Sequence, residues 1–238
     1  MQKAVYPMRI NKYLALHKYC TRKAADELIQ QGRVTINGRK AVLGDKVSES
    51  DAVEVRAPKQ TLHYYMYNKP RGIITHSPQG EEKEIADIIS LKGVFPVGRL
   101  DKDSCGLIIL TDDGRTTDAL LNPAHEHEKE YEVVTLTTLP PRFKQRMEGR
   151  VDIGGYRTKR SVVKLLGEKK FTIIITEGKK HQIRRMCGAF GQSTVELKRV
   201  RVMNIKLGGL KPGTFRAIEG AELETFLHAL GITPQKHP

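Results

Sequence analysis

The loop within VFPVGRLDKDSCGLIILTDDG (residues 94–114) carries side chains that could do chemistry. An apolar approach ends at Gly98, a polar cluster follows, and an apolar run begins directly after Gly106. Polar residues held between two buried elements lie on a supported loop, and such loops often carry function. Asp101 and Asp103 could suggest the two carboxylates of a glycosidase, but a spacing of two residues in a loop does not fix their separation. Asp103 is more typical of a turn or cap residue. The residues alone therefore indicate a polar loop around Asp101.

A second cluster, TEGKKHQIRRMCGAFG (residues 176–191), is basic. Its apolar side chains recur at helical spacing and are expected to face the core: Ile183, Met186, Cys187 and Phe190. Arg184 and Arg185 flank that stripe, where adjacent arginines can pair with a carboxylate or bind phosphate. A solvated basic face is the alternative, and the spacing does not decide between them.

Other kinds of site lack support in the sequence. The HEHE segment at residues 125–128 has no third ligand at a recognisable spacing, so no metal site is expected. GRLDKDSCG matches neither the nucleotide-binding nor the dinucleotide-binding glycine pattern, and no Ser-His-Asp signature is present. We therefore expect neither a metal nor an organic cofactor.

The charge of the chain points to a polyanionic partner. Forty-one Lys and Arg against 27 Asp and Glu give a formal net charge of +14. The surplus is concentrated in residues 1–60 and in residues 178–201, which hold seven basic residues and one acidic residue. Such clustering is typical of a nucleic-acid-binding surface rather than of a diffusely charged one.

The first 58 residues predict a small module of two helices and a hairpin. A short helix is expected over residues 9–19, and Thr21 can cap a second helix that Gly32 ends. Asn37-Gly38 between alternating apolar residues is a strong hairpin signal. The module presents a basic face made of Arg9, Lys12, Arg22, Lys23 and Arg33.

From residue 59 to residue 238 the pattern predicts a second domain. Segments rich in β-branched and aromatic residues indicate strands. Helices are expected near residues 82–90, 115–121, 140–148, 181–190 and 221–230. Because strands and helices do not alternate regularly, we expect an α+β fold with a mixed, largely antiparallel sheet and flanking helices.

Targeting signals and cysteine usage favour the cytoplasm. The N-terminus lacks the apolar region of a signal peptide, and no apolar run is long enough to cross a bilayer. Three widely spaced cysteines without a CxxC pair argue against a disulfide framework. A monomer that does not associate with membranes is expected.

Four motifs occur in one order along the chain: NKPRGIITH, GRLDKDSCGLIILTDDG, HEKEYEV and EGKKHQIRRMCGAFG. With them, residues 62–218 resemble the catalytic domain of the RsuA/RluB/RluF group of ribosomal RNA pseudouridine synthases. Residues 9–55 resemble an S4 RNA-binding domain, including its helix–helix–hairpin order. The resemblance covers nearly the whole chain and is strongest to the RluF branch, which modifies large-subunit (23S) RNA.

The resemblance implies a role for each of several residues. Asp101, in GRLD, corresponds to the catalytic carboxylate, and Tyr131, in KEY, to the tyrosine that packs against the target base. Arg184, in HQIRRM, corresponds to the arginine that pairs with Asp101. Arg99 corresponds to the residue that helps to hold the base out of its stack. Lys179, Lys180, Arg185 and the basic face of the first module are expected to contact RNA phosphates.

The implied reaction isomerises a uridine of ribosomal RNA, as free RNA or within a ribosomal particle, without a cofactor. The carboxylate could act as a nucleophile at C1′ or as a base at C2′, and the sequence does not choose. Small-subunit (16S) RNA is an alternative target. A non-catalytic S4-type ribosome factor is a further alternative, although the intact set Asp101, Tyr131 and Arg184 argues against it.

Overall fold

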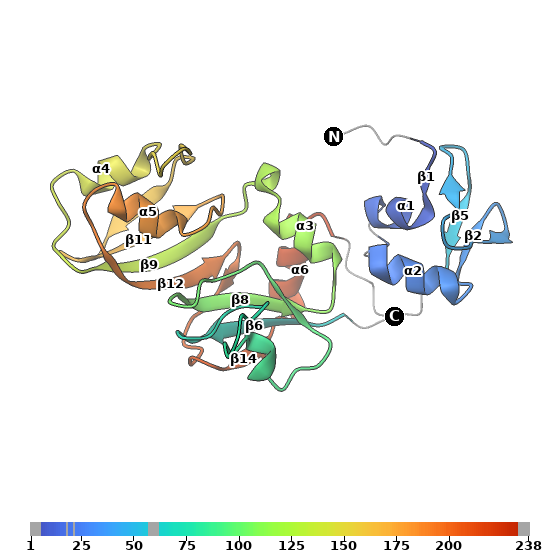
Figure 1. Ribbon diagram of the computed structural model, residues 1–238, viewed down its shortest axis with the longest axis horizontal. Coiled ribbons are helices and arrows are strands. Elements are labelled where there is room, and N and C mark those ends of the chain that lie inside the picture. Colours follow the sequence, from blue (N-terminus) through green and yellow to red (C-terminus); the bar gives the residue numbers. More distant parts are fainter. Residues whose placement is uncertain (1–5, 18, 21, 57–61, 233–238) are drawn as a thin grey trace. The chain divides into compact units, whose positions relative to one another are not determined.

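The computed structural model describes residues 6–17, 19–20, 22–56 and 62–232 (Figure 1). They form two compact units, one up to residue 62 together with residues 113–116, the other of residues 63–112 and 117 onward. The boundary expected between residues 58 and 59 and the helix cap expected at Thr21 lie outside the described residues.

The N-terminal unit contains two helices and short strands, in agreement with the expected order. The helices are α1 (Ile10–Leu16) and α2 (Arg22–Gln30). The strands are β1 (Met8–Arg9), β2 (Val34–Ile36), β3 (Arg39–Lys40), β4 (Lys46–Val47) and β5 (Val53–Val55). Strands β3, β2 and β5 form one sheet, and β1 pairs with β4. Asn37 and Gly38 both have positive φ, 50° and 79°, as a tight hairpin turn between β2 and β3 requires.

The larger unit is built on one nine-stranded sheet. Its strands are β6 (Tyr64–Lys69), β7 (Phe95–Val97), β8 (Cys105–Thr111), β9 (Lys129–Thr135), β10 (Val162–Leu165), β11 (Lys170–Ile175), β12 (Thr194–Val202), β13 (Ile205–Lys206) and β14 (Phe215–Ala217). The order across the sheet is β10-β11-β9-β12-β8-β6-β14, with β13 beside β12 and β7 beside β8. The pairing of β12 with β8 is parallel, and the other pairings in this sheet are antiparallel. The expected mixed, largely antiparallel sheet is confirmed.

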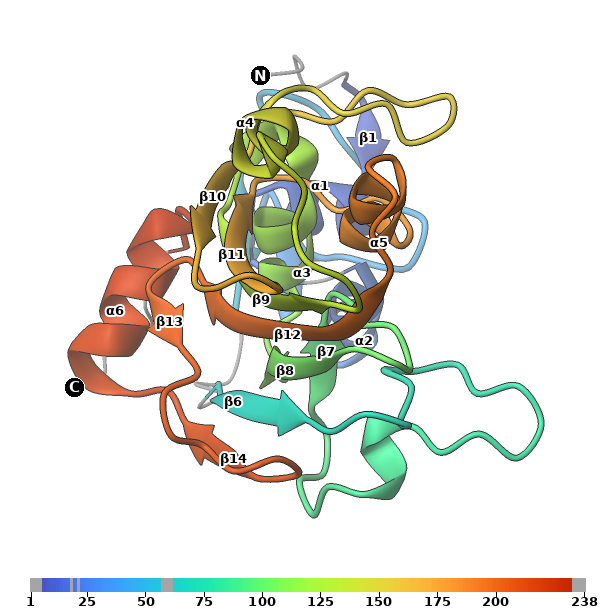
Figure 2. The ribbon, with the colours of Figure 1, turned by 90° about the vertical axis from the view of Figure 1, so that its left-hand side faces the viewer.

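Four α-helices flank this sheet: α3 (Arg115–Leu121), α4 (Phe143–Glu148), α5 (Gln182–Gly188) and α6 (Gly220–Ala229). Short 3-10 turns lie at η1 (Ile85–Asp87) and η2 (Pro123–His125). Both views place α4 and α5 on the same face of the strands β11, β9 and β12 (Figures 1 and 2). Their apolar faces join the main core through Phe143, Met147, Ile183 and Met186.

The helix expected over residues 82–90 is wrong, because only the single turn η1 forms there. Ile85 is buried, whereas Ala86, Asp87 and Ile88 are exposed, so no continuous apolar face supports a longer helix. The Glu84 and Asp87 side chains cap the turn reciprocally. Local polar contacts therefore hold this segment in place of helical packing.

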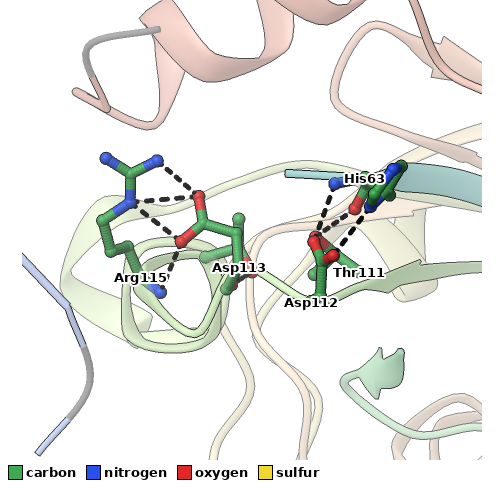
Figure 3. Close-up of polar contacts among 6 residues, drawn as sticks. His63, Thr111, Asp112, Asp113 and Arg115 are labelled. Atoms are coloured by element: carbon green, nitrogen blue, oxygen red, sulfur yellow. Dashed lines mark hydrogen bonds and ion pairs between the residues drawn. The ribbon is translucent and has the colours of Figure 1, made fainter. Parts of the chain in front are cut away.

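Polar contacts fasten the start of β6 to the end of β8 (Figure 3). The backbone N–H of His63 donates to Asp112 at 2.7 Å, and the His63 ring lies 2.8 Å from the same carboxylate. The Thr111 hydroxyl donates to the His63 carbonyl at 2.6 Å. Asp113 accepts hydrogen bonds from two guanidinium nitrogens of Arg115 at the start of α3, as the figure shows.

In the described part of the chain, no helix combines the length and the apolarity that a membrane crossing needs.

Candidate active site

Asp101 lies on the loop between β7 and β8, and backbone contacts fix that loop on both sides of it. Leu100, which is buried, exchanges two hydrogen bonds with the Thr75 hydroxyl, at 2.9 and 2.8 Å. The Lys102 carbonyl accepts from the N–H of Gly72 at 2.9 Å. The Asp101 side chain is nonetheless 40% exposed. The fold thus presents an accessible carboxylate on an immobilised backbone.

The side chain of Lys69, near this loop, is fully buried. Lys69, at the end of β6, donates to the carbonyls of Pro70 and Ile73 at 2.9 and 2.5 Å. Burial lowers the pKa of Lys69 to about 8, although electrostatic interactions with Cys105, Asp101 and Asp103 act in the opposite direction. A buried basic side chain therefore lies within electrostatic range of the Asp101 loop.

Arg184 also contacts this loop, but at different atoms from those expected. Its guanidinium donates to the Asp103 carbonyl at 3.1 Å and contacts the Ser104 hydroxyl at 3.4 Å. A further hydrogen bond reaches the Thr194 carbonyl at 3.1 Å. Among the contacts of the described residues there is no ion pair between Arg184 and the Asp101 carboxylate. Arg184 therefore braces the segment that follows Asp101, and its direct pairing with that carboxylate stays a prediction.

The ion-pair partner that the structure gives to Asp101 is a histidine. Nε2 of His181 lies 3.5 Å from Oδ1 of Asp101, and the two side chains are 49% and 40% exposed. His181 directly precedes α5 and has a φ of 52°. The basic cluster at residues 176–191 and the loop at residues 94–114 thus meet in space, which the sequence did not establish.

Tyr131 is placed by the register of the sheet. It lies on β9 opposite Ile173 of β11 and Arg199 of β12, and Arg199 in turn pairs with Gly106 at the start of β8. It is 8% exposed and packs in the core cluster that includes Leu100 of the Asp101 loop and Ile183 of α5. Its role at the base stays a prediction.

The residues expected to contact RNA present their side chains to solvent in most cases. In the larger unit these are Arg99, Lys179, Lys180 and Arg185. Lys179 lies over the ring of Tyr156 at 4.4 Å, and Arg185 donates to the carbonyl of Gly154 at 3.0 Å. In the N-terminal unit Arg9, Lys12, Arg22 and Lys23 are exposed and Arg33 is half-buried.

Within the described ranges, no group of three or more His, Cys, Asp or Glu side chains could hold a metal ion.

Reasoning from the sequence missed three residues around this site, Lys69, His181 and Glu177. Glu177 is 4% exposed and accepts three hydrogen bonds at the start of the turn that leads into α5. A charged residue inside an apolar strand pattern, as in MYNK at the end of β6, is the one signal that could have drawn attention to Lys69. No comparable signal exists for the other two.

Comparisons with known proteins agree on one family. A family model described as RNA pseudouridylate synthase matches residues 63–189, and a model of the S4 domain matches residues 8–53. The chain is 39% identical over 223 residues to the dual-specificity RNA pseudouridine synthase RluF of Escherichia coli strain K12, covering 91% of this chain and 77% of that protein. It is 33% identical over 230 residues to the ribosomal large subunit pseudouridine synthase B of Bacillus subtilis strain 168, covering 91% and 94%.

The comparison with solved structures agrees with this family. A crystal structure of a pseudouridylate synthase superposes with a TM-score of 0.67 at 26% identity, covering 94% of this chain and 99% of that one. The family match spans more than half of the chain and includes the loop of Asp101, β9 with Tyr131, and α5 with Arg184. This chain therefore belongs to the RNA pseudouridylate synthase family, as an S4 domain followed by a synthase domain, and it is an RNA pseudouridine synthase.

Proposed function

We propose that this enzyme converts one uridine of large-subunit (23S) ribosomal RNA to pseudouridine, with Asp101 as the catalytic carboxylate. The observation that carries the assignment of Asp101 is its setting, an exposed carboxylate on a loop whose backbone is fixed by Thr75 and Gly72. Relatives named for RluF and for large-subunit activity support the choice of RNA.

The isomerisation of uridine requires few protein groups. The N1–C1′ bond of the nucleoside breaks, the uracil turns, and a C5–C1′ bond forms. A proton leaves C5 and a proton is gained at N1, so atoms and electrons balance without a co-reactant. One ionised carboxylate suffices, as a nucleophile at C1′ or as a base at C2′. We therefore propose that no metal or organic cofactor takes part.

The remaining site residues divide the other tasks in this proposal. The uracil must leave its stack before it can react, which calls for a flipping residue and an aromatic surface. Arg99 helps to hold the base out, and Tyr131 packs against it and relays the C5 proton directly or through water. Arg184 keeps the carboxylate oriented and ionised. Its contacts with Asp103 and Ser104 support that role, because they place a guanidinium on the same loop.

Binding of the RNA is assigned to the two basic regions. We propose that Arg9, Lys12, Arg22, Lys23 and Arg33 of the S4 domain and Lys179, Lys180 and Arg185 of the synthase domain contact phosphates. Their exposure and the formal net charge of +14 support this assignment. The enzyme is proposed to act as a monomer in the cytoplasm, on free ribosomal RNA or on a ribosomal particle.

Pseudouridine mapping tests the proposal. Ribosomal and transfer RNA from cells that lack the protein would be treated with carbodiimide and mapped by primer extension. The same cells would carry the wild type or Asp101→Asn. We expect one 23S site to vanish on deletion and to return only with the wild type. Asp101→Asn is nearly isosteric, so it should keep RNA binding while turnover falls by more than about 1,000-fold.

The other outcomes are equally informative. A site lost from 16S RNA would replace the proposed target while leaving the assigned residue intact. An unchanged map across all RNA would refute the catalytic proposal in these cells. Restoration of the site by Asp101→Asn would refute the assignment of the carboxylate.

A further inference from the structure

The turn before α5 is held by a buried carboxylate that the proposed reaction does not use. Glu177 accepts hydrogen bonds from the Tyr156 hydroxyl at 2.5 Å, from the backbone N–H of Lys159 at 2.8 Å and from Nε2 of Gln182 at 2.9 Å. The hydrogen bond to Glu177 is the main reason that the pKa of Tyr156 is raised. A buried carboxylate that accepts three hydrogen bonds is held rigidly in place.

Hydrogen bonds continue from Glu177 along the turn that contains His181. The side-chain oxygen of Gln182 accepts from the backbone N–H of Lys179 at 2.9 Å, and the backbone N–H of Gln182 donates to the Lys179 carbonyl at 3.0 Å. Residues 179–182 are thus closed by two hydrogen bonds. His181 lies inside this closed turn with a φ of 52°, a conformation that non-glycine residues rarely adopt without support.

The result is that a supported imidazole lies beside the Asp101 carboxylate. Nε2 of His181 lies 3.5 Å from Oδ1 of Asp101, and in the described part of the chain it is the only ion-pair partner of that carboxylate. Such contacts are often long in a free enzyme and tighten when substrate binds. The positive φ of His181 therefore accompanies a position of its ring next to Asp101.

We propose that His181 is a positioning residue for Asp101, and that Glu177 and Tyr156 act through it by fixing the turn. The inference rests on the proposed function, since it assumes that Asp101 reacts. An N–H at Nε2 of His181 orients the carboxylate toward the ribose and contributes to catalysis rather than to binding of the RNA. Gln182 transmits the constraint from Glu177 to the turn.

A matched pair of substitutions isolates the N–H group. Glutamine at position 181 can place an N–H donor close to the position of Nε2, whereas leucine cannot, and both are unbranched at Cβ at the same positive φ. Steady-state kinetics on a ribosomal RNA fragment containing the mapped site would compare wild type, His181→Gln and His181→Leu. His228→Leu, at an exposed position of α6, is the control.

We expect His181→Leu to lower kcat by at least about 10-fold with KM changed by less than about 2-fold, because orientation is lost and binding is not. His181→Gln should retain kcat to within about 3-fold, and His228→Leu should match the wild type. Equal losses in the two position-181 variants, or wild-type kcat in both, would overturn the inference. Inactivity of the wild-type enzyme would instead count against the proposed function.

A double-mutant cycle tests the buried network. Tyr156→Phe removes the hydroxyl that donates to Glu177 but keeps the ring beneath Lys179. If Tyr156 acts through His181, its substitution should lower kcat several-fold in the wild type and have no further effect in His181→Leu. Additive losses would show that Tyr156 does not act through the histidine and would overturn that part of the proposal.

Discussion

Three basic side chains lie near the Asp101 carboxylate, and each makes different contacts. His181 approaches the carboxylate itself, Arg184 holds the backbone after it, and Lys69 lies buried at the end of β6. His181 is exposed and Arg184 is half-buried, whereas Lys69 is fully buried and donates to two carbonyls. One of the three basic groups near the carboxylate therefore has no contact with solvent.

Lys69 makes the stability of the protein depend on pH in a predictable direction. Because burial lowers its pKa to about 8, the folded chain loses this proton at a lower pH than the unfolded chain does. The unfolded chain therefore binds more protons between about pH 8 and the ordinary lysine pKa, and wild-type stability rises with pH there. Relative to Lys69→Met, the wild type should gain on the order of 2 kcal/mol in free energy of unfolding between about pH 7.5 and 9.5.

Urea denaturation of both variants across that pH range measures the difference. Lys129, whose pKa burial also lowers to about 8, is present in both variants and cancels. A difference in stability that does not vary with pH would show that Lys69 keeps its proton throughout.

At the scale of residues, the sequence predicts which segments carry polar side chains better than it predicts the contacts of those side chains. Asp101 and Arg184 stand in motifs that can be read from the chain, and the structure brings their loop and helix together. Which side chain meets the carboxylate depends on the left-handed turn at His181. That turn depends on Glu177 and Tyr156, which lie in different segments. Spacing along the chain carries no information on such contacts.

The parallel contact between β8 and β12 lies where the Asp101 loop ends. Arg199 of β12 pairs with Gly106 of β8, and its Nε donates to the Leu107 carbonyl at 2.6 Å. Arg199 is 4% exposed, so this contact lies within the core. β12 also pairs with β9, which carries Tyr131. One strand therefore sets the relative positions of two of the proposed catalytic elements.

Gly106 is required at this contact because the two backbones approach closely. A Cβ at Gly106 would lie 2.2 Å from the Arg199 carbonyl oxygen, and its φ is +105°. Gly106→Ala should lower the free energy of unfolding by about 3 kcal/mol or more, since neither the backbone conformation nor the contact tolerates a methyl group. Urea denaturation, compared with Gly167→Ala, measures this effect.

Gly167 is the appropriate control because a Cβ there meets no atom within 4 Å and its φ is not positive. Gly167→Ala should unfold within about 0.5 kcal/mol of the wild type. Equal stability of the two alanine variants would mean that β8 and β12 do not approach as closely as described.

Elements with a strong local signal could be predicted from the sequence, and those that depend on distant packing could not. The Asn37-Gly38 hairpin and the helix over residues 115–121 are confirmed, because turn chemistry and apolar spacing specify them locally. The helix expected over residues 82–90 does not form, because Ala86, Asp87 and Ile88 are exposed and leave no continuous apolar face. The pairing of β12 with β8 joins segments far apart in the chain, so no local pattern reveals it.

At the scale of the whole molecule, the surplus of positive charge is divided between the S4 domain and the synthase domain. Binding to RNA releases one set of counterions for each phosphate that is neutralised, wherever the contact lies. The dependence of affinity on salt therefore counts phosphate contacts without any knowledge of how the two domains are arranged. It separates charges that bind RNA from charges that merely keep the protein soluble.

Replacing Arg9, Lys12, Arg22 and Lys23 together by glutamine should reduce the salt dependence of RNA binding. All four side chains are exposed, so the substitutions should leave the fold intact. If each contacts one phosphate, the slope of log affinity against log salt should become shallower by about 3.

A control with the same loss of charge replaces four exposed lysines of the synthase domain by glutamine: Lys164, Lys169, Lys206 and Lys211. Equal slopes for the two variants, measured by titration of a ribosomal RNA fragment, would show that the S4 face acts only through net charge. A change confined to the first variant would locate the phosphate contacts on that face.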